Sequence, residues 1–356
     1  MSMDRLNNIN IVAEELLASP IRVKAELALP PAAEAFVFES RERIKQILDH
    51  RNHRLLMVVG PCSIHNVESG LEYARRLKRL SDDLQDTMLL VMRVYFEKPR
   101  TSVGWKGLIN DPHLDDSFRI EEGLRVARRF LLQLTELRLP AGTETLDPIV
   151  PQYIGDLISW TAIGARTSES QTHREIASGL SSPVGFKNGT DGNIDLAVNA
   201  IRSAQNPHHF LGITQDGCSA VFRTAGNRHA HIVLRGGTKP NYDRASIAYC
   251  QEKLLEAGLP ASILIDCSHG NSNRNPNQQP RVFEEGVRQI MAGNRSVIGF
   301  MMESNLEPGS QAIPADLSTL HPGISVTDDC MGWDATERVL RAEHEKLKAV
   351  LPRRFS

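Results

Sequence analysis

Short apolar runs alternate with longer amphipathic stretches over most of the chain. The amphipathic stretches, such as residues 70–84 and 121–137, are typical of helices. The apolar runs are continuous, which is typical of parallel strands buried on both faces. We predict strands at residues 55–60, 89–96, 139–144, 162–166, 183–187, 231–235, 263–269 and 297–303. Eight β/α units predict an α/β protein with a (β/α)8 TIM barrel, and a doubly wound open sheet is the alternative.

Two segments lie outside this repeating pattern. We expect residues 1–40 to form an N-terminal arm, because Pro30 and Pro31 interrupt any helix and a regular helical pattern begins only at residue 39. Residues 209–225 contain two extended runs around Asp216-Gly217, which predicts a β-hairpin ribbon inserted between the fifth and sixth strands. Residues 41–356 would then form the barrel. The arm and ribbon are interpreted as oligomer or regulatory elements, or as simple covers for apolar surface.

Composition narrows the class of protein. The 356 residues include 41 Lys and Arg against 43 Asp and Glu, and a formal charge of −2 argues against a protein that binds nucleic acid or an anionic membrane. No apolar run is long enough to span a membrane, and the N-terminus lacks a secretion-signal pattern. The five cysteines are scattered and odd in number, which does not indicate a disulfide framework. We therefore expect a cytoplasmic protein.

Charged residues recur at the ends of the predicted strands. Because these ends converge on one mouth of a TIM barrel, we expect the side chains to face a common cavity. The cationic members are Arg93, Lys98, Arg100, Arg166, Lys187 and Arg235. So many positive charges indicate more than one anionic ligand group, such as a phosphate and a carboxylate, and the backbone at Gly164-Ala165 adds N–H donors. The alternative is that they form surface salt bridges.

A second set at the same mouth combines sulfur, nitrogen and oxygen donors. Its members are Cys62, His269, Glu303 and Asp328. No short metal-binding motif is present, but the first, seventh and eighth strands are neighbours in a closed barrel. This donor set suits one divalent Mn, Fe, Co or Zn ion better than magnesium. The alternative is a buried structural cysteine near a core histidine.

Long motifs in the chain resemble a known family. They are GPCSIH (60–65), MRVYFEKPRTSVGWKGLINDPH (92–113), AIGARTSESQTHRE (162–175), PVGFKNGTDG (183–192), LRGGTKPNY (234–242) and DCSHGNSN (266–273). Over residues 5–345 the chain resembles the type I 3-deoxy-D-arabino-heptulosonate 7-phosphate (DAHP) synthases, in particular the tyrosine-sensitive subgroup. The resemblance implies a TIM barrel with an N-terminal extension and an inserted ribbon.

The resemblance also implies roles for individual positions. Those that match the family's metal ligands are Cys62, His269, Glu303 and Asp328. Those that match its phosphoenolpyruvate site are Arg93, Lys98, Ala165, Arg166, Lys187 and Arg235. Arg100 and Thr101 match the residues that hold the phosphate of erythrose 4-phosphate.

The implied reaction joins phosphoenolpyruvate to erythrose 4-phosphate with the addition of water. We expect the metal, held in part by Cys62, to polarise the sugar aldehyde. Lys98 is the expected proton donor to the developing alkoxide, with a pKa depressed by neighbouring cations, and Glu144 is expected to handle the attacking water. A rival hypothesis makes Lys187 a Schiff-base lysine of a metal-independent aldolase. A third makes the protein a non-enzymatic sensor of a sugar phosphate.

Feedback inhibition by an aromatic amino acid is a further implication. The matching effector positions are Pro151, Gln152, Leu180, Ser181, Phe210 and Gly212. We expect tyrosine as the effector, because Gly212 replaces a serine of phenylalanine-sensitive relatives and leaves room for the extra hydroxyl. Phe222 and the segment Leu320-His321-Pro322-Gly323, which precedes Asp328, depart from the family pattern. The family also implies a homodimer or homotetramer with the arm and ribbon at interfaces.

Overall fold

A closed barrel of parallel strands forms the centre of the molecule. The computed structural model describes residues 6–100 and 104–355, and within them eight strands close in the order β1-β10-β9-β8-β5-β4-β3-β2. These strands are β1 (Leu55–Gly60), β2 (Met88–Arg93), β3 (Ala141–Glu144), β4 (Trp160–Ile163), β5 (Val184–Lys187), β8 (Ala230–Leu234), β9 (Ile263–Asp266) and β10 (Val297–Glu303). The closed parallel order confirms the predicted TIM barrel and excludes the open sheet.

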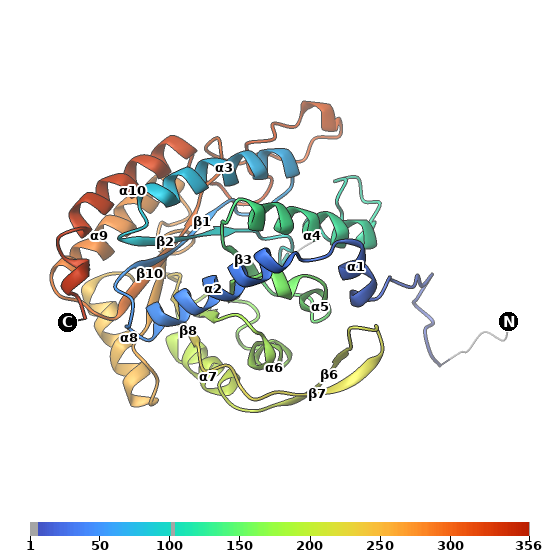
Figure 1. Cartoon of the computed structure of the whole chain (residues 1–356), viewed down its shortest axis with the longest axis horizontal. Helices are drawn as coiled ribbons and strands as arrows, with labels where there is room; N and C mark the ends of the chain where they lie inside the picture. The colour runs from blue at the N-terminus through green and yellow to red at the C-terminus, as the bar shows by residue number, and fades with distance from the viewer. Residues whose placement is uncertain (1–5, 101–103, 356) are drawn as a thin grey trace.

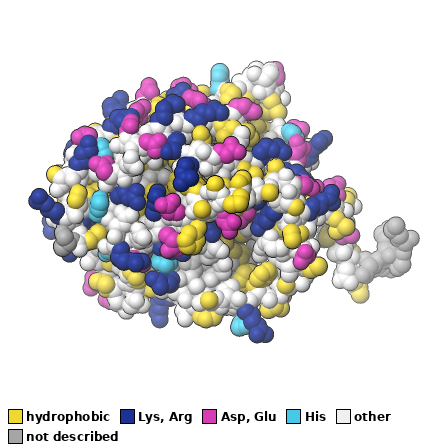
Figure 2. Space-filling model, viewed as in Figure 1, with side chains coloured by type: hydrophobic (Ala, Val, Ile, Leu, Met, Phe, Trp, Pro, Cys, Tyr) yellow, Lys and Arg dark blue, Asp and Glu magenta, His cyan; other side chains and the backbone are white. Residues whose placement is uncertain are grey.

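Helices follow the barrel strands and surround them (Figure 1). They are α3 (Val67–Asp83), α4 (Ile120–Glu136), α5 (Val150–Ile154), α6 (Gln171–Gly179), α7 (Ile194–Ala204), α8 (Arg244–Glu256), α9 (Gln279–Met291) and α10 (Trp333–Leu347). Short 3₁₀ turns are η1 (Gly155–Leu157), η2 (Pro276–Gln278), η3 (Leu317–Thr319) and η4 (Leu351–Arg353). Among the described residues, we find no helix with the length and apolar character needed to cross a membrane. Figure 2 shows acidic and basic side chains intermingled on one face, in keeping with the near-neutral formal charge.

The barrel strands contribute alternately to two apolar clusters. On β1, Leu55, Met57 and Val59 pack against the surrounding helices, whereas Leu56 and Val58 belong to the cluster inside the barrel. This alternation follows from the two-residue period of a strand. The same alternation places the last residue of five strands on the interior side, namely those of β2, β3, β5, β9 and β10. These last residues are all charged, and they are Arg93, Glu144, Lys187, Asp266 and Glu303.

The N-terminal helices α1 (Pro20–Glu26) and α2 (Pro31–Leu48) precede the barrel. Ile44 and Ile47 of α2 join the interior cluster at the amino ends of the strands, so α2 covers that end of the barrel. Its start at Pro31 corrects the expectation that regular helix begins only at residue 39. A proline at the first helical position costs no hydrogen bond, because that backbone nitrogen has no partner within the helix.

The predicted ribbon is present as a separate two-stranded antiparallel sheet, β6 (His209–Ile213) and β7 (Ser219–Arg223). It lies between α7 and β8 in the chain and projects from the barrel beside α5 and α6 (Figure 1). Gly217 in its turn has a φ of +84°, a conformation that favours glycine. At the tip, the carbonyl of Gln215 accepts a hydrogen bond of 2.8 Å from the backbone nitrogen of Ile21. The N-terminal segment and the ribbon are therefore in contact.

Candidate active site

A cavity of about 570 Å³ opens at the carboxyl ends of the barrel strands. The sequence-predicted residues that line it are Lys98, Arg100, Glu144, Ala165, Arg166, Lys187, Arg235, His269, Glu303 and Asp328. Two predicted members, Arg93 and Cys62, are fully buried, and Thr101 lies outside the described residues. Most of the predicted cationic residues and metal ligands therefore lie around one cavity, as the convergence of strand ends in a TIM barrel requires.

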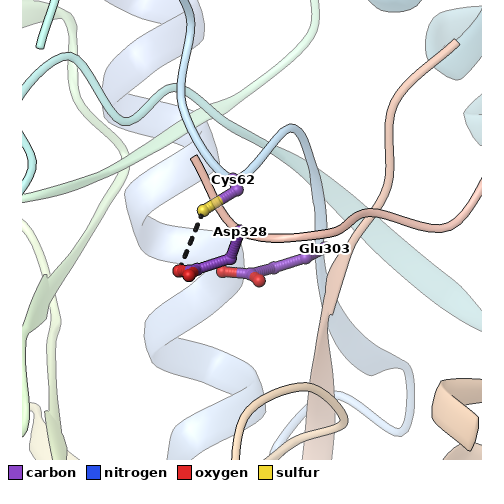
Figure 3. A group of neighbouring side chains, drawn as sticks. All are labelled: Cys62, Glu303 and Asp328. Atoms are coloured by element: carbon purple, nitrogen blue, oxygen red, sulfur yellow. Dashed lines mark hydrogen bonds between the residues drawn. The ribbon is translucent and has the colours of Figure 1, made fainter. Parts of the chain in front are cut away.

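Three potential metal ligands come together at one side of this cavity. One donor atom each from Cys62, Glu303 and Asp328 lies within 4.8 Å of the others, and their side chains point toward one another (Figure 3). The fourth predicted ligand is close by, because His269 Nε2 lies 3.9 Å from Glu303 Oε1. The parallel pairing of Gly60 with Glu303 explains how the loop after β1 delivers Cys62 to the end of β10.

Asp328 reaches the cluster from a loop far along the chain. Backbone hydrogen bonds of 2.9 Å, from Met331 N to Glu303 O, and of 2.8 Å, from Asn305 N to Met331 O, fasten this loop to the end of β10. The thiol of Cys62 donates a hydrogen bond of 3.5 Å to Asp328 Oδ2. The unusual Leu320–Gly323 segment therefore leaves Asp328 within reach of the other ligands.

The chemistry of the cluster fits a transition metal ion. Burial, and next the negative charge of Glu303, raise the pKa of Cys62 to about 11, so the thiol keeps its proton when no metal ion is bound. Binding of a divalent cation favours the thiolate and displaces that proton. A thiolate with an imidazole and carboxylates is a donor set for Mn, Fe, Co or Zn and not one that magnesium prefers.

Lys98 lies directly beside the cluster. Its ammonium group donates to Cys62 Sγ at 3.1 Å and to the Cys62 carbonyl at 3.2 Å. Burial alone would lower the pKa of Lys98, but Cys62, Glu303, Glu144 and Asp328 outweigh burial and raise it. The expectation that neighbouring cations depress this pKa is therefore wrong, because the groups nearest to the ammonium are acidic.

Arg93 lies beneath the cavity and not on its wall. Its guanidinium donates to Glu303 Oε1 at 3.0 Å and to the carbonyl of Pro61 at 3.3 Å, and it stacks on the ring of Tyr95 at 3.9 Å. The side chain has no exposed surface. Arg93 thus orients Glu303 and supplies positive charge from below.

Glu144 lines the cavity and has one carboxylate oxygen without a hydrogen-bond partner among the residues that the structure describes. This oxygen, Oε1, is buried. A Cβ on Gly164 would collide with this oxygen, so a larger residue at 164 would require the Glu144 carboxylate to move. Ala165 and Arg166 follow this glycine on the same wall. The arrangement leaves Glu144 available to a water molecule or a substrate.

Three residues in or next to the site received no role from the sequence. Asp266, the last residue of β9, forms an ion pair of 2.8 Å with Lys187. Arg274 lines the cavity from the loop after His269. Glu97 precedes Lys98 in the chain and is buried outside the cavity lining, and burial, followed by the negative charge of Asp147, raises its pKa to about 8. Of the three, only Asp266 and Glu97 follow a recognisable sequence pattern, because they are charged residues at or just after strand ends.

The predicted effector positions lie outside the barrel, around the ribbon. Gln152 on α5 accepts a hydrogen bond of 2.5 Å from Gln215 Nε2 at the ribbon tip. The ring of Phe210 on β6 lies beside Gly179, which ends α6 and precedes Leu180 and Ser181. Gly212 follows on the same face of β6 as Phe210. The segments that hold all six positions therefore border the ribbon. The remaining position, Pro151, directly precedes Gln152 on α5.

Comparison with known proteins agrees with the geometry. A family model described as the DAHP synthetase I family matches residues 26–341. The chain is 54% identical over 351 residues to the Tyr-sensitive phospho-2-dehydro-3-deoxyheptonate aldolase of Salmonella typhimurium, with 99% of each chain covered. It is 53% identical over 356 residues to the Tyr-sensitive enzyme of that name from Escherichia coli, with 100% of each chain covered.

A solved structure extends the likeness to three dimensions. The phospho-2-dehydro-3-deoxyheptonate aldolase from Francisella tularensis superimposes with a TM-score of 0.93 at 44% sequence identity, covering 97% of this chain and 99% of that one. The chain therefore belongs to the DAHP synthetase I family, as its motifs predicted.

Proposed function

We propose that this chain is a DAHP synthase, which condenses phosphoenolpyruvate with erythrose 4-phosphate and water to give DAHP and inorganic phosphate, the first step of the shikimate pathway. The observation that carries the proposal is a single cavity in which the Cys62–Glu303–Asp328 cluster adjoins several cationic side chains. The substrates carry two phosphates and one carboxylate, which guanidinium and ammonium groups neutralise. Relatives at 53–54% identity are phospho-2-dehydro-3-deoxyheptonate aldolases by name.

Phosphoenolpyruvate would bind the deeper cations of the cavity. We assign its phosphate and carboxylate to Arg166, Lys187 and Arg235, with the Ala165 backbone as a further donor and with Lys98 and Arg93 at the inner end. Lys187 and Arg235 are buried at the ends of neighbouring strands, which favours a fixed geometry for the bound anion. Arg100, which is exposed at the cavity edge, would hold the phosphate of erythrose 4-phosphate together with Thr101.

Cys62, His269, Glu303 and Asp328 would hold one divalent ion, Mn, Fe, Co or Zn. Such an ion supplies Lewis-acid polarisation of the sugar aldehyde when bound. Arg93 holds Glu303 in place, and the thiol proton of Cys62 must leave for the sulfur to become a ligand. The affinity for metal should therefore rise with pH.

The remaining chemistry is proton handling by this chain's own side chains. A bond forms between C3 of phosphoenolpyruvate and the aldehyde carbon, and Lys98 Nζ donates a proton to the aldehyde oxygen as it gains charge. Water adds to C2 of the phosphoenolpyruvate unit and gives a proton to Glu144. The resulting hydroxyl passes its proton to the departing phosphate oxygen as the C2–O bond to phosphate breaks, which leaves the keto group and releases inorganic phosphate.

Release of phosphate tests this proposal directly. We expect phosphate release only with both substrates, loss of activity with a chelator, and recovery with Mn²⁺. Borohydride treatment in the presence of substrate distinguishes the Lys187 Schiff-base hypothesis, since a covalent adduct at Lys187 with activity insensitive to chelators would overturn the metal mechanism. Binding of sugar phosphates without any turnover would instead indicate the sensor.

We propose tyrosine as the feedback inhibitor, bound near Pro151, Gln152, Leu180, Ser181, Phe210 and Gly212. The names of the relatives from Salmonella typhimurium and Escherichia coli describe those enzymes as Tyr-sensitive, which supports this choice. Inhibition curves with tyrosine, phenylalanine and tryptophan test it. Stronger inhibition by phenylalanine than by tyrosine would contradict it.

We also propose a homodimer or homotetramer in the cytoplasm, with the arm of residues 1–40 and the ribbon of residues 209–225 at the interfaces. Val12 and Leu16 of the arm are fully exposed, and Leu211 on the outer face of the ribbon is 81% exposed. Apolar side chains of this kind favour burial against a second copy. All five cysteines, each in the described part of the chain, are free thiols, which suits a reducing compartment. Sedimentation of wild type and Leu211→Lys tests the oligomer, which the charge should weaken.

A further inference from the structure

Asp266 connects the proposed metal site to the proposed phosphoenolpyruvate site. It is the last residue of β9, fully buried and on the interior side of the barrel. Its Oδ2 accepts a hydrogen bond of 2.8 Å from Lys187 Nζ and lies 3.0 Å from His269 Nδ1. The same oxygen atom therefore contacts Lys187, a cation of the cavity wall, and His269, a predicted metal ligand.

The other carboxylate oxygen helps to fix the protonation of His269. Asp266 Oδ1 accepts hydrogen bonds from the Ser268 hydroxyl at 2.6 Å and from the Ser268 backbone nitrogen at 3.0 Å. Because the hydroxyl proton points to Oδ1, the Ser268 oxygen, 2.7 Å from His269 Nδ1, can only accept from that nitrogen. Nδ1 therefore carries the imidazole proton and donates it toward Asp266 and Ser268. Nε2 is left with its lone pair, at 3.9 Å from Glu303 Oε1.

We infer that Asp266 is a positioning residue that makes binding of the metal ion and binding of phosphoenolpyruvate favour each other. A cation at His269 Nε2 makes the Nδ1–H group a stronger donor, which strengthens its bond to Asp266 Oδ2. The bond from Lys187 to the same oxygen is then weakened, and the ammonium is freer to turn to an anionic substrate. By linkage, a substrate that draws Lys187 away must in turn strengthen metal binding. The inference rests on the proposed function, since it takes both ligands from it.

Titration with Co²⁺ measures this coupling without recourse to turnover. Binding of Co²⁺ to the Cys62 thiolate gives a near-ultraviolet charge-transfer band, so the dissociation constant is read from absorbance with and without saturating phosphoenolpyruvate. In wild type we expect phosphoenolpyruvate to tighten Co²⁺ binding several-fold. In Asp266→Asn we expect Co²⁺ affinity to fall about 10- to 100-fold, as for other partners of metal-bound histidines, and the effect of phosphoenolpyruvate to disappear.

Asp329→Asn is the matched control. It removes one carboxylate from the wall of the same cavity, where Asp329 pairs with the Ser310 hydroxyl. We expect the coupling in this variant to remain that of wild type. Wild-type coupling in a folded Asp266→Asn protein would overturn the inference, as would its equal loss in Asp329→Asn. Wild type that binds neither Co²⁺ nor phosphoenolpyruvate would instead contradict the proposed function.

A second variant decides the matter if Asp266→Asn does not fold, which circular dichroism would show. Ser268→Ala removes the hydroxyl between Asp266 and His269 and leaves the pair of Lys187 with Asp266 intact. We expect Co²⁺ to bind several-fold more weakly, while the affinity for phosphoenolpyruvate without metal stays at the wild-type value. A wild-type Co²⁺ affinity that saturating phosphoenolpyruvate does not change would overturn the inference, whatever the variants show.

Discussion

The ring of Phe222 fills the space that a side chain at position 212 would occupy. A Cβ on Gly212 would lie 2.8 Å from two atoms of this ring, and the ring stacks on Phe210 with centroids 5.7 Å apart. The interpretation that Gly212 leaves room for a tyrosine hydroxyl is therefore incomplete, because in this structure the room is taken by Phe222. Any ligand beside Gly212 must contact or displace this aromatic ring.

We expect Phe222→Ala to weaken inhibition by tyrosine. Loss of the ring removes an aromatic stacking partner and leaves a gap between β6 and β7, and the concentration for half-inhibition should rise about tenfold, equivalent to about 1.4 kcal/mol. Uninhibited activity should be unchanged, because the ribbon lies outside the barrel. Inhibition curves at fixed substrate concentrations measure the effect.

Leu211→Ala is the control for this prediction. Leu211 neighbours Gly212, but its side chain is 81% exposed on the opposite face of the ribbon. Its inhibition curve should match that of wild type. Superimposable curves for Phe222→Ala and wild type would show that the ring plays no part in effector binding.

Replacement of Lys98 by methionine should reduce kcat by about 10²- to 10⁴-fold, the range for loss of a general acid. The ammonium lies 3.1 Å from Cys62 Sγ, so no other group replaces it as a proton donor at that point without rearrangement. Lys106→Met is the matched control, because Lys106 is exposed in the same connecting segment. Steady-state kinetics with both substrates at saturation provide the measurement, and a kcat within a few-fold of wild type would exclude Lys98 as the acid.

His231 should make the fold sensitive to acid. Burial lowers its pKa to about 4, and its Nε2 accepts a hydrogen bond of 3.2 Å from Trp160 Nε1, which a proton on Nε2 would abolish. The unfolded chain binds a proton near pH 6.5, whereas the native protein does not until about pH 4. The contribution of neutral His231 to the free energy of unfolding is therefore fully present above pH 6.5 and falls by up to about 3 kcal/mol as the pH drops toward 4.

Urea unfolding between pH 4 and pH 7 measures this dependence. His231→Gln should flatten the curve relative to wild type, whereas His209→Gln, at an exposed position on the ribbon, should leave it unchanged. Parallel curves for wild type and His231→Gln would contradict the prediction.

Gly123→Ala should destabilise the protein although alanine is the better helix former. In an open helix the substitution would gain about 1 kcal/mol. Here a Cβ on Gly123 of α4 would collide with the backbone carbonyl of Ile109, and overpacking of this kind costs about 1–3 kcal/mol. The midpoint of thermal unfolding should fall by several degrees. Gly155→Ala, where a Cβ would meet nothing within 4 Å, is the control, and a midpoint for Gly123→Ala at or above wild type would refute the steric argument.

The barrel, and the end of it that holds the site, could be predicted from the order of residues along the chain. Continuous apolar runs of strand length encode two-sided burial, and the two-residue period puts the charged last residue of several strands on the interior side. Glu144, Lys187 and Glu303 were found because they end predicted strands, and strand ends converge on one mouth of a TIM barrel. Such periodicities are local properties of the chain, which is why they can be read without a structure.

How these groups act on one another became visible only in the folded molecule. It placed Arg93 under the cavity, made the surroundings of Lys98 acidic, joined Lys187 to His269 through Asp266, and set Phe222 against Gly212. Each of these relationships depends on a distance between segments far apart in the chain. Electrostatic and steric energies change steeply over a few ångströms, and no local pattern of residues records such distances.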